Sequence, residues 1–401
     1  EMLTRRIQRY LDGDEKFSPL PDVMLIDGGI THAGVAERVC AQMHVRVPIF
    51  GMVKDDRHRT NELLYGNPPA QGRILLIPMT TGARAHLVPD AVAQGMKWHD
   101  IDFYQNGKIG YLKSMLAFAK MLKQEKPDII HCQMARIVPA CAIAAKMAAP
   151  KARVFYHARG LDAETYPKIA KLFDKLGVYI IANCKHEQEK LVRHGFPATR
   201  IAYTYNALPA VDTAPEKLQK DYIMLGTLSR LDKVRNLADT LQVFKMLDDK
   251  HLPVRLQIAG IGEETDNLKA LAQQLGIAEK VSFLGGVRDL NSYFQNTDIL
   301  LNTPNVAGDH GAGVGNNILE AGLYRTPVVS YDAAGISEMV INGQTGYCTP
   351  LLDLPAFSAA VETLVNDADL RRRYGDALNR HVTHLCSDEE IYRTTMAAYN
   401  M

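Results

Sequence analysis

Short apolar runs alternate with longer amphipathic segments along most of the 401-residue chain. The apolar runs contain few polar positions, whereas the segments between them repeat apolar residues at helical spacing. Strands that are apolar at nearly every position are buried on both faces, as in parallel sheets covered by helices. The pattern therefore predicts an α/β protein. We expect strands at residues 23–26, 47–53, 74–78, 128–132, 154–157, 178–182, 201–206, 222–228, 254–260, 281–285, 299–302 and 327–331.

The alternation is interrupted by ALPAVDTAPEKLQKD at residues 207–221, which is polar and rich in Ala and Pro. A new series starts directly afterwards with YIMLGTL, so we interpret this stretch as a linker between two doubly wound, Rossmann-like domains. Ligands of such domains bind beyond the carboxyl ends of the strands, and a cleft between the two domains is the expected site. The chain after Asp353 is expected to be helical.

A second, turn-rich break occurs at GNPPAQGR, residues 66–73. The segment before this break does not resemble the segments that follow it. We therefore expect three parts, namely residues 1–70, a first Rossmann-like domain at 71–210 and a second at 211–401.

Composition excludes several classes of protein. Hydrophobic residues make up 47%, charged residues 23%, and the formal net charge is +1, so a nucleic-acid partner is not expected. The six cysteines include no CxxC pair, which favours reduced thiols in the cytoplasm over disulfides or a zinc site. No apolar run approaches the ~20 residues that span a bilayer, and no signal peptide is visible. The chain begins at Glu1 rather than at an initiator Met, as a fragment would.

Two arginines follow the first strand of the second domain, in LGTLSRLDKVRNL. Arg230 and Arg235 would lie between a strand end and a helix start, where guanidinium groups can hold a pyrophosphate through paired hydrogen bonds. The alternative is a pair of solvated surface arginines. The sequence thus offers these two residues as candidates for binding a diphosphate.

Glycines follow the next two strands, at Gly260 in IAGIGEE and Gly285 in FLGGVRDL. Residues without a side chain let the backbone approach a ligand closely, although most such glycines only form turns. Both positions are therefore candidate ligand contacts at the same end of the sheet.

The stretch GAGVGNNILEAGLYRTPVV places a glycine-rich turn before a short helix. The backbone of Gly313, Val314, Gly315 and Asn316 would present N–H groups to a phosphate at the helix N-terminus. Glu320 would lie near the end of that helix, where a carboxylate can accept hydrogen bonds from vicinal hydroxyl groups. The alternative for Glu320 is a salt bridge on the helix.

These stretches occur in the order and spacing of a known family. Residues 72–401 resemble the family-4 retaining glycosyltransferases of the GT-B fold, through SRLDKVRNL, IAGIGEE, VSFLGGVRDL and GVGNNILEAGLYRTPVVSYDAAGISEMVINGQTGYCTP. The resemblance implies that Arg230 and Arg235 bind the donor diphosphate and that Glu320 binds the donor ribose. In the family, Arg235 is usually Lys, and a second Glu stands where this chain has Ala312. Asp309 and His310 are candidate substitutes for that Glu.

The first Rossmann-like domain resembles the acceptor side of the same family. VFYHARGLD is similar to the family strand that ends in a His beside the cleft, which implies that His157 contacts the transferring sugar. A structural hydrogen bond is the alternative for His157. Thr81 and Gly82 follow another strand and are further candidates.

The resemblance implies a hexosyltransferase of EC class 2.4 that uses a nucleotide-diphospho-sugar, with a UDP-type donor favoured. The expected mechanism is metal-independent and uses no further cofactor, since no DxD cluster stands in a suitable loop. A cell-envelope glycan or lipid-linked sugar is the expected acceptor, as in polysaccharide biosynthesis. The lysine-rich helix expected at residues 111–126 allows peripheral contact at the inner face of the plasma membrane, with a solvated helix face as the alternative.

The first seventy residues resemble a different family. RRIQRY, PDVMLIDGG and KDDRHRT are similar to parts of the RNase H-like nuclease domain of UvrC, an excision-repair subunit, and Asp27 matches one of its metal-binding carboxylates. The domain's other catalytic regions are missing, so a complete nuclease site is not expected. The segment also reads as strand, glycine turn, helix, strand. Three interpretations stay open, namely a degenerate fusion, an artefact of the sequence, or a segment that completes the shortened first Rossmann-like domain with Gly28 and Gly29 at the cleft.

Three functions stay open at this point. The first is a glycosyltransferase, the second is a fragmentary UvrC-type endonuclease, and the third is a catalytically weak protein that binds a sugar nucleotide. Magnesium-dependent DNA cleavage would identify the second, and donor binding without turnover would identify the third.

Overall fold

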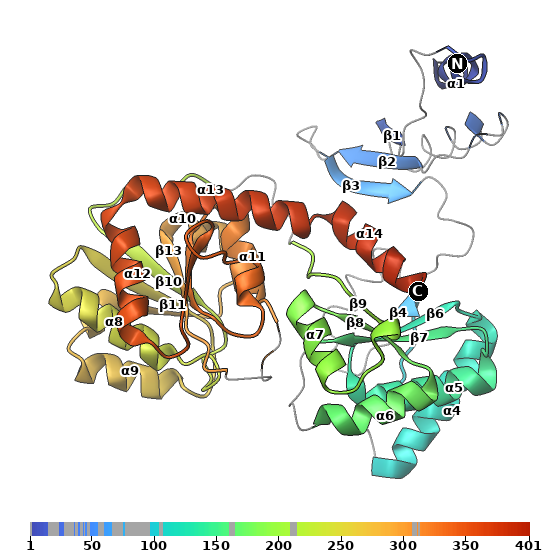
Figure 1. Ribbon diagram of the computed structural model, residues 1–401, viewed down its shortest axis with the longest axis horizontal. Helices are drawn as coiled ribbons and strands as arrows, with labels where there is room; N and C mark the ends of the chain where they lie inside the picture. Colours follow the sequence, from blue (N-terminus) through green and yellow to red (C-terminus); the bar gives the residue numbers. More distant parts are fainter. Residues whose placement is uncertain are drawn as a thin grey trace. The chain divides into compact units, whose positions relative to one another are not determined.

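The computed structural model separates into two compact units, residues 1–104 and 105–401, which are treated individually below (Figure 1). The structure describes residues 2–14, 24–27, 36, 39–40, 43, 45, 49–54, 60–65, 75–76, 97–103, 107–159, 165–208, 215–306, 311 and 313–401.

The described residues of the first unit include helix α1, a small mixed sheet and a short strand pair. Strands β1 and β2 are parallel, as the predicted strand–helix–strand pattern requires, and β3 adds to β2 in antiparallel direction. Strands β4 and β5 form a separate parallel pair. Ile7 of α1 packs in a small cluster with Ala36, Cys40 and Val45. The elements are α1 (Met2–Leu11), β1 (Met24–Asp27), β2 (Ile49–Lys54), β3 (Thr60–Tyr65), β4 (Leu75–Leu76) and β5 (Lys97–Trp98).

The second unit begins with a four-stranded, entirely parallel sheet in the order β6-β7-β8-β9. Helices alternate with these strands, so each strand is followed by a crossover of the kind that parallel pairing needs. The elements are α4 (Gly107–Glu125), β6 (Ile129–Cys132), α5 (Val138–Ala148), β7 (Arg153–Ala158), α6 (Tyr166–Leu176), β8 (Tyr179–Ala182), α7 (Lys185–Arg193) and β9 (Ile201–Tyr203), with short 3₁₀ helices at Ala135–Ile137 and Ala198–Arg200.

The second sheet has six parallel strands in the order β12-β11-β10-β13-β14-β15. The chain enters at β10, builds outward to β12, and returns to start the other half at β13. Strand order therefore reverses between β10 and β13, the position where doubly wound sheets bind ligands. The strands are β10 (Ile223–Leu228), β11 (Val254–Ala259), β12 (Val281–Gly285), β13 (Ile299–Asn302), β14 (Val328–Tyr331) and β15 (Gly346–Thr349).

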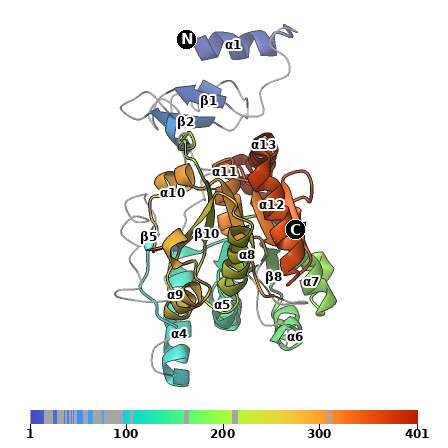
Figure 2. The same ribbon diagram turned by 90° about the vertical axis from the view of Figure 1, so that its left-hand side faces the viewer.

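Helices cover both faces of this six-stranded sheet. One face buries Leu241 of α8 and Val361 of α12, and these two helices pack together (Figure 2). The opposite face buries Ile318 of α11 and Leu378 of α13. The helices are α8 (Leu237–Asp249), α9 (Thr265–Gln274), α10 (Leu290–Asn296), α11 (Asn316–Leu323), α12 (Leu354–Asn366) and α13 (Ala368–Leu385), with 3₁₀ turns at Ala278–Lys280 and Ile336–Glu338.

The helical tail predicted after Asp353 is confirmed, and its last helix returns to the first sheet of this unit. Asp353, Asp367 and Ser387 cap α12, α13 and α14 (Asp388–Tyr399), each accepting a hydrogen bond from a backbone N–H of the first turn. Ala398 of α14 packs in a cluster with Phe155 and Ile181. The two sheets are therefore joined both by the linker and by α13–α14.

The fold expectation of two Rossmann-like α/β domains is confirmed. Three strands were not predicted, namely β3, β5 and β15. TNELLY of β3 mixes polar and apolar positions, and GYCT of β15 is short and starts with glycine, so neither shows a continuous apolar run. The three-part domain division remains a prediction.

Candidate functional site

A cavity of about 1080 Å³ lies at the carboxyl ends of the second sheet's strands. Its walls come from the ends of β10, β11 and β13 and from the turn before α11. Asn183 and Asn206, which follow β8 and β9, close it from the first sheet. The cavity therefore lies between the two Rossmann-like domains and next to the reversal of strand order, where the sequence predicted the site.

Most of the candidate residues of the second domain line this one cavity. The described candidates that do so are Arg230, Arg235, Gly260, Gly313, Val314, Gly315, Asn316 and Glu320. Gly285 does not, but its neighbour Gly286 does. The sequence motifs therefore predicted a shared site for residues that are separated by up to ninety positions along the chain.

The two arginines differ in their surroundings. The Arg230 side chain is 74% exposed and pairs with Asp232 at 3.1 Å. Arg235 is half-buried, and its Nε finds no hydrogen-bond partner among the described residues. Burial lowers the pKa of Arg235 from its usual value, while Asp232 raises it. A half-buried guanidinium group that lines a cavity is suited to an anionic ligand.

Gly260 serves the packing of neighbouring strand ends as well as the cavity. Its φ is +146°, and a Cβ at this position would lie 1.8 Å from the carbonyl oxygen of Ser229. Gly262 is equally restricted, because its Cβ would lie 2.1 Å from the carbonyl oxygen of Leu231. The backbones of the turns after β10 and β11 are therefore in close contact where these turns line the cavity.

The turn before α11 presents backbone to the cavity. Gly315 is the N-cap residue of α11 and has no side chain to cap the helix, so the first N–H groups are left for another acceptor. Gly313 has φ +77°, a left-handed conformation that favours glycine. One turn later, Glu320 is half-buried, and burial raises the pKa of its carboxyl group above the usual value.

His157 lies at the end of β7 and packs against another histidine. Its ring stacks on that of His131, with centroids 5.2 Å apart and an interplanar angle of 8°. Burial, together with the charges of His131 and Arg159, lowers the pKa of His157 to about 3, so the ring is neutral. Arg159, two residues further on, lines the cavity, whereas His157 is not among the lining residues. Contact of His157 with a sugar remains a prediction.

Several candidates lie outside the described residues. These are Thr81, Gly82, Gly28, Gly29, Asp309, His310 and the Ala312 position. Asp27 ends strand β1, and only its backbone is described. The roles expected for these residues stay predictions.

Sequence reasoning missed two asparagines at strand ends. Asn302 ends β13, donates to Ser330 Oγ at 2.9 Å and accepts from Asn317 Nδ2 at 3.3 Å. Asn183 follows β8 and stands against Gly313. Both asparagines could have been recognised as polar residues at the end of an apolar run, but the sequence analysis relied on the glycine motifs instead.

Three family models match successive parts of the chain. The Glycosyltransferase Family 4 model matches residues 97–210, and the Glycosyl transferases group 1 model matches residues 211–381. Residues 97–381 are therefore similar to the two domains of glycosyltransferases. The UvrC RNAse H endonuclease domain matches residues 1–86. Both resemblances inferred from the sequence motifs are therefore confirmed.

Curated relatives divide in the same way. The capsular polysaccharide biosynthesis glycosyltransferase CapM of Staphylococcus aureus is 26% identical over 313 residues, covering 72% of this chain and 80% of CapM. UvrABC system protein C of Finegoldia magna is 43% identical over 70 residues, covering 17% of this chain. The match spans only 12% of that UvrC protein's length.

A solved structure supports the GT-B fold. HepE of Anabaena, crystallised in complex with UDP, superposes with a TM-score of 0.70 and 17% sequence identity. The match covers 83% of this chain and 93% of HepE.

Two further features bear on the class of site. No helix in the described ranges combines the length and apolar character that a membrane span requires. Within those same ranges, no group of three His, Cys, Asp or Glu side chains gathers as ligands for one metal ion.

Proposed function

We propose that residues 105–401 transfer a hexose, with retention of anomeric configuration, from a UDP-sugar to a cell-envelope glycan or a lipid-linked sugar. The observation that carries this proposal is the gathering of two arginines, the turn before α11 and Glu320 around one cavity between the two domains. CapM, which is named for capsular polysaccharide biosynthesis, supports the acceptor class. HepE, crystallised with UDP, supports the nucleotide.

The residues of the cavity suit this chemistry. Cleavage of the bond between the anomeric carbon and the diphosphate passes through an oxocarbenium-like state, and negative charge develops on the leaving diphosphate. Arg235 and the uncapped N–H groups at the start of α11 would stabilise that charge, and more strongly in a partly buried cavity than in water. Glu320 would accept hydrogen bonds from the ribose hydroxyl groups. No metal ion is required in this proposal.

A thermal-shift screen of UDP, GDP and ADP tests the donor site. Because a ligand at 100 times its Kd stabilises the native state by about 2.7 kcal/mol, UDP should raise Tm by roughly 5 °C. Glu320→Ala should abolish most of this shift. Glu362→Ala, which changes a glutamate of α12 outside the cavity lining, is the matched control and should keep it. A chain whose Tm no nucleotide raises would overturn the proposal.

Product stereochemistry tests retention. The donor linkage in UDP-glucose is α, so the first-formed free sugar from slow hydrolysis should be α-glucose, as read by NMR before mutarotation. A β product would contradict retention. UDP binding without release of sugar from any UDP-sugar would identify the alternative of a catalytically weak binding protein.

Helix α4 supports peripheral contact with a membrane. Ile109, Leu112 and Leu116 are exposed by 72%, 51% and 50%, and Lys113 and Lys120 are exposed on the same helix. Apolar side chains beside lysines match the boundary between headgroups and acyl chains of an anionic bilayer. The acceptor of the proposed reaction would then be reached at the membrane surface.

A further inference from the structure

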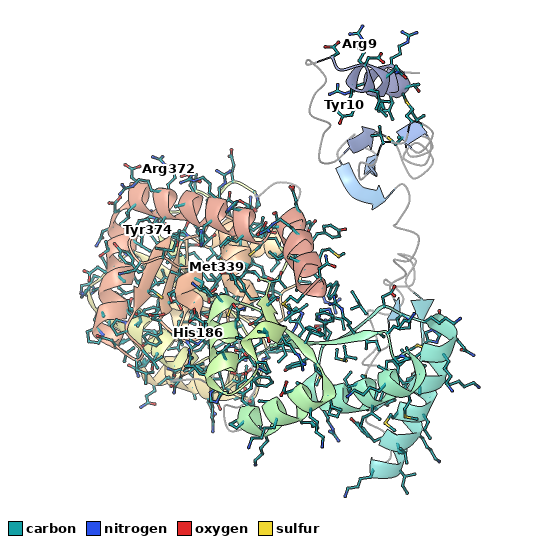
Figure 3. The ribbon with its side chains drawn as sticks, turned by 45° about the vertical axis from the view of Figure 1, so that its right-hand side comes forward. Arg9, Tyr10, His186, Met339, Arg372 and Tyr374 are labelled. Atoms are coloured by element: carbon teal, nitrogen blue, oxygen red, sulfur yellow. The ribbon has the colours of Figure 1, made fainter. Side chains whose placement is uncertain are left out.

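Helix α7 belongs to the first Rossmann-like domain, yet both of its ends hold segments of the second. At its start, the carboxylate of Glu338 accepts hydrogen bonds from the backbone N–H groups of Lys185 at 3.0 Å and His186 at 2.7 Å. The Tyr205 hydroxyl donates to the same carboxylate at 2.7 Å. Figure 3 labels His186, which lies on α7, and Met339, the residue after Glu338. A carboxylate at a helix N-terminus is favourable because the helix dipole is positive there.

Further along α7, Lys190 reaches the turn before α11. Its Nζ donates to the carbonyl oxygen of Gly311 at 2.9 Å and pairs with Glu187 Oε2 at 2.5 Å. Both side chains of the pair are 0% exposed. The Tyr166 hydroxyl donates to Glu187 Oε1 at 2.6 Å, and the Tyr166 ring lies 5.2 Å from the ammonium group. The Lys190 ammonium group therefore contacts a carboxylate, a backbone carbonyl group and an aromatic ring.

The same turn is also in close contact with the start of α7. A Cβ on Gly313 would lie 2.7 Å from Asn183 Oδ1 and 2.8 Å from Cys184 Sγ. A Cβ on Gly311 would lie 2.6 Å from Ala334 Cβ and 2.9 Å from Val306 Cγ1. The turn is thus confined between β8–α7 of the first domain and the loop before Glu338 of the second, and Lys190 holds its carbonyl group.

A fully buried ion pair contributes little to the free energy of unfolding. Removing two charges from water costs several kcal/mol per ion, and apolar residues of similar volume often serve a core equally well. The placement of this pair next to the cavity gives it another role. Gly311 lines the cavity and lies two residues before Gly313, so the lysine fixes backbone that faces the ligand space.

We infer that Lys190, oriented by Glu187, is a positioning residue that holds Gly311, and with it Gly313–Gly315, in the geometry that binds the donor diphosphate. This inference rests on the proposed function, because it assigns Lys190 to the same donor site. Lys190 is not among the residues that line the cavity, so it acts through the Gly311 carbonyl group. The first domain would thereby control donor binding by the second.

The test uses the full chain with Lys190→Met/Glu187→Leu, which removes both buried charges together. Lys217→Met is the matched control, because Lys217 donates to the carbonyl oxygens of Phe294 and Thr297 and does not line the cavity. UDP affinity and hydrogen–deuterium exchange of peptides that cover residues 311–317 are measured on each folded variant. We expect at least tenfold weaker UDP binding and faster exchange in the double variant, with neither change in Lys217→Met.

The outcomes separate the two claims. If the unmodified chain binds UDP and the double variant binds it equally well, the inference is overturned and the proposed function stands. If the unmodified chain binds no nucleotide, the proposed function fails. Hydrogen–deuterium exchange at residues 311–317 then tests by itself whether Lys190 holds this part of the backbone. Faster exchange in the double variant would still support the hold on the turn, and unchanged exchange would overturn it. Glu187→Leu alone, which leaves the lysine charge buried, should also accelerate exchange if orientation by Glu187 matters.

Discussion

The imidazole rings of His131 and His157 stack in parallel, 5.2 Å between centroids, at the ends of neighbouring strands. His131 Nδ1 lies 2.6 Å from the Tyr399 hydroxyl. In the described part of the chain, Nε2 of neither ring has a hydrogen-bond partner. Burial and the Arg159 charge lower the pKa of His131 to about 4 and contribute to lowering that of His157 to about 3.

This pair predicts an acid-sensitive fold. Because both pKa values lie below the unfolded value of about 6.5, the pair stabilises the fold above pH 6.5, and this stability is lost as pH falls toward 4. Each ring should cost about 2 kcal/mol at pH 5 relative to pH 7.5. Denaturant unfolding should show a shallower pH slope in His131→Asn and in His157→Asn. Tyr399→Phe keeps both rings and should keep the slope, and an unchanged slope in both histidine variants would contradict the argument.

The two arginines should contribute unequally to donor binding. Arg235 is half-buried at the wall of the cavity, whereas Arg230 is exposed and paired with Asp232. Since hydrogen bonds to charged groups are worth about 1.5–3 kcal/mol, Arg235→Ala should weaken UDP binding about 10- to 100-fold. Exposed pairs contribute under about 1 kcal/mol, so Arg230→Ala should cost less than about fivefold. Titration calorimetry measures both, and equal losses would refute the distinction.

Gly260 should tolerate no side chain. A Cβ there would overlap the Ser229 carbonyl oxygen, at a φ of +146° that other residues rarely adopt. Gly260→Ala should therefore lower the free energy of unfolding by about 3 kcal/mol or more. Gly285 has φ +68° with open space around it, so Gly285→Ala should cost only about 1–2 kcal/mol. Urea denaturation measures the loss of unfolding free energy in both variants. A larger loss in Gly285→Ala than in Gly260→Ala would contradict the prediction.

Helix α4 should bind anionic vesicles. Replacing Ile109, Leu112 and Leu116 with Ser removes the apolar side chains and keeps the lysines, so sedimentation with phosphatidylglycerol vesicles should weaken at least about tenfold. The control is Met147→Ser with Leu172→Ser, which changes exposed apolar residues on α5 and α6. Equal binding by both variants would show that α4 is only a solvated helix.

The sequence predicted the parallel architecture well because strands buried on both faces leave continuous apolar runs, as in YIIA of β8. Motif order then placed Arg235 and Glu320 at one cavity, since the carboxyl ends of parallel strands meet at the same edge. The environment of His157 could not be read in the same way. Its stacking partner His131 lies on another strand, and Tyr399, which contacts His131, lies on the last helix.

The hydrogen bond between Lys190 and the Gly311 carbonyl group could not be predicted from the sequence either. The segment KHEQEKLVRHG is mostly polar, and lysine side chains are rarely fully buried. In the fold, Tyr166 of the first domain and Gly311 of the second both contact this buried pair. The burial of Lys190 therefore depends on tertiary contacts that the local sequence does not reveal.

The return of α14 to the first sheet has a consequence for how the protein is made. Phe155 and Ile181 are synthesised in the first half of the chain, but Ala398, which packs on them, emerges from the ribosome near the end. At 5–20 residues per second, that face of the sheet stays uncovered for roughly 10–40 s during translation. The early domain would then depend on chaperones for longer than its position in the chain suggests, and ribosome stalling within the later domain would leave an apolar surface exposed to aggregation.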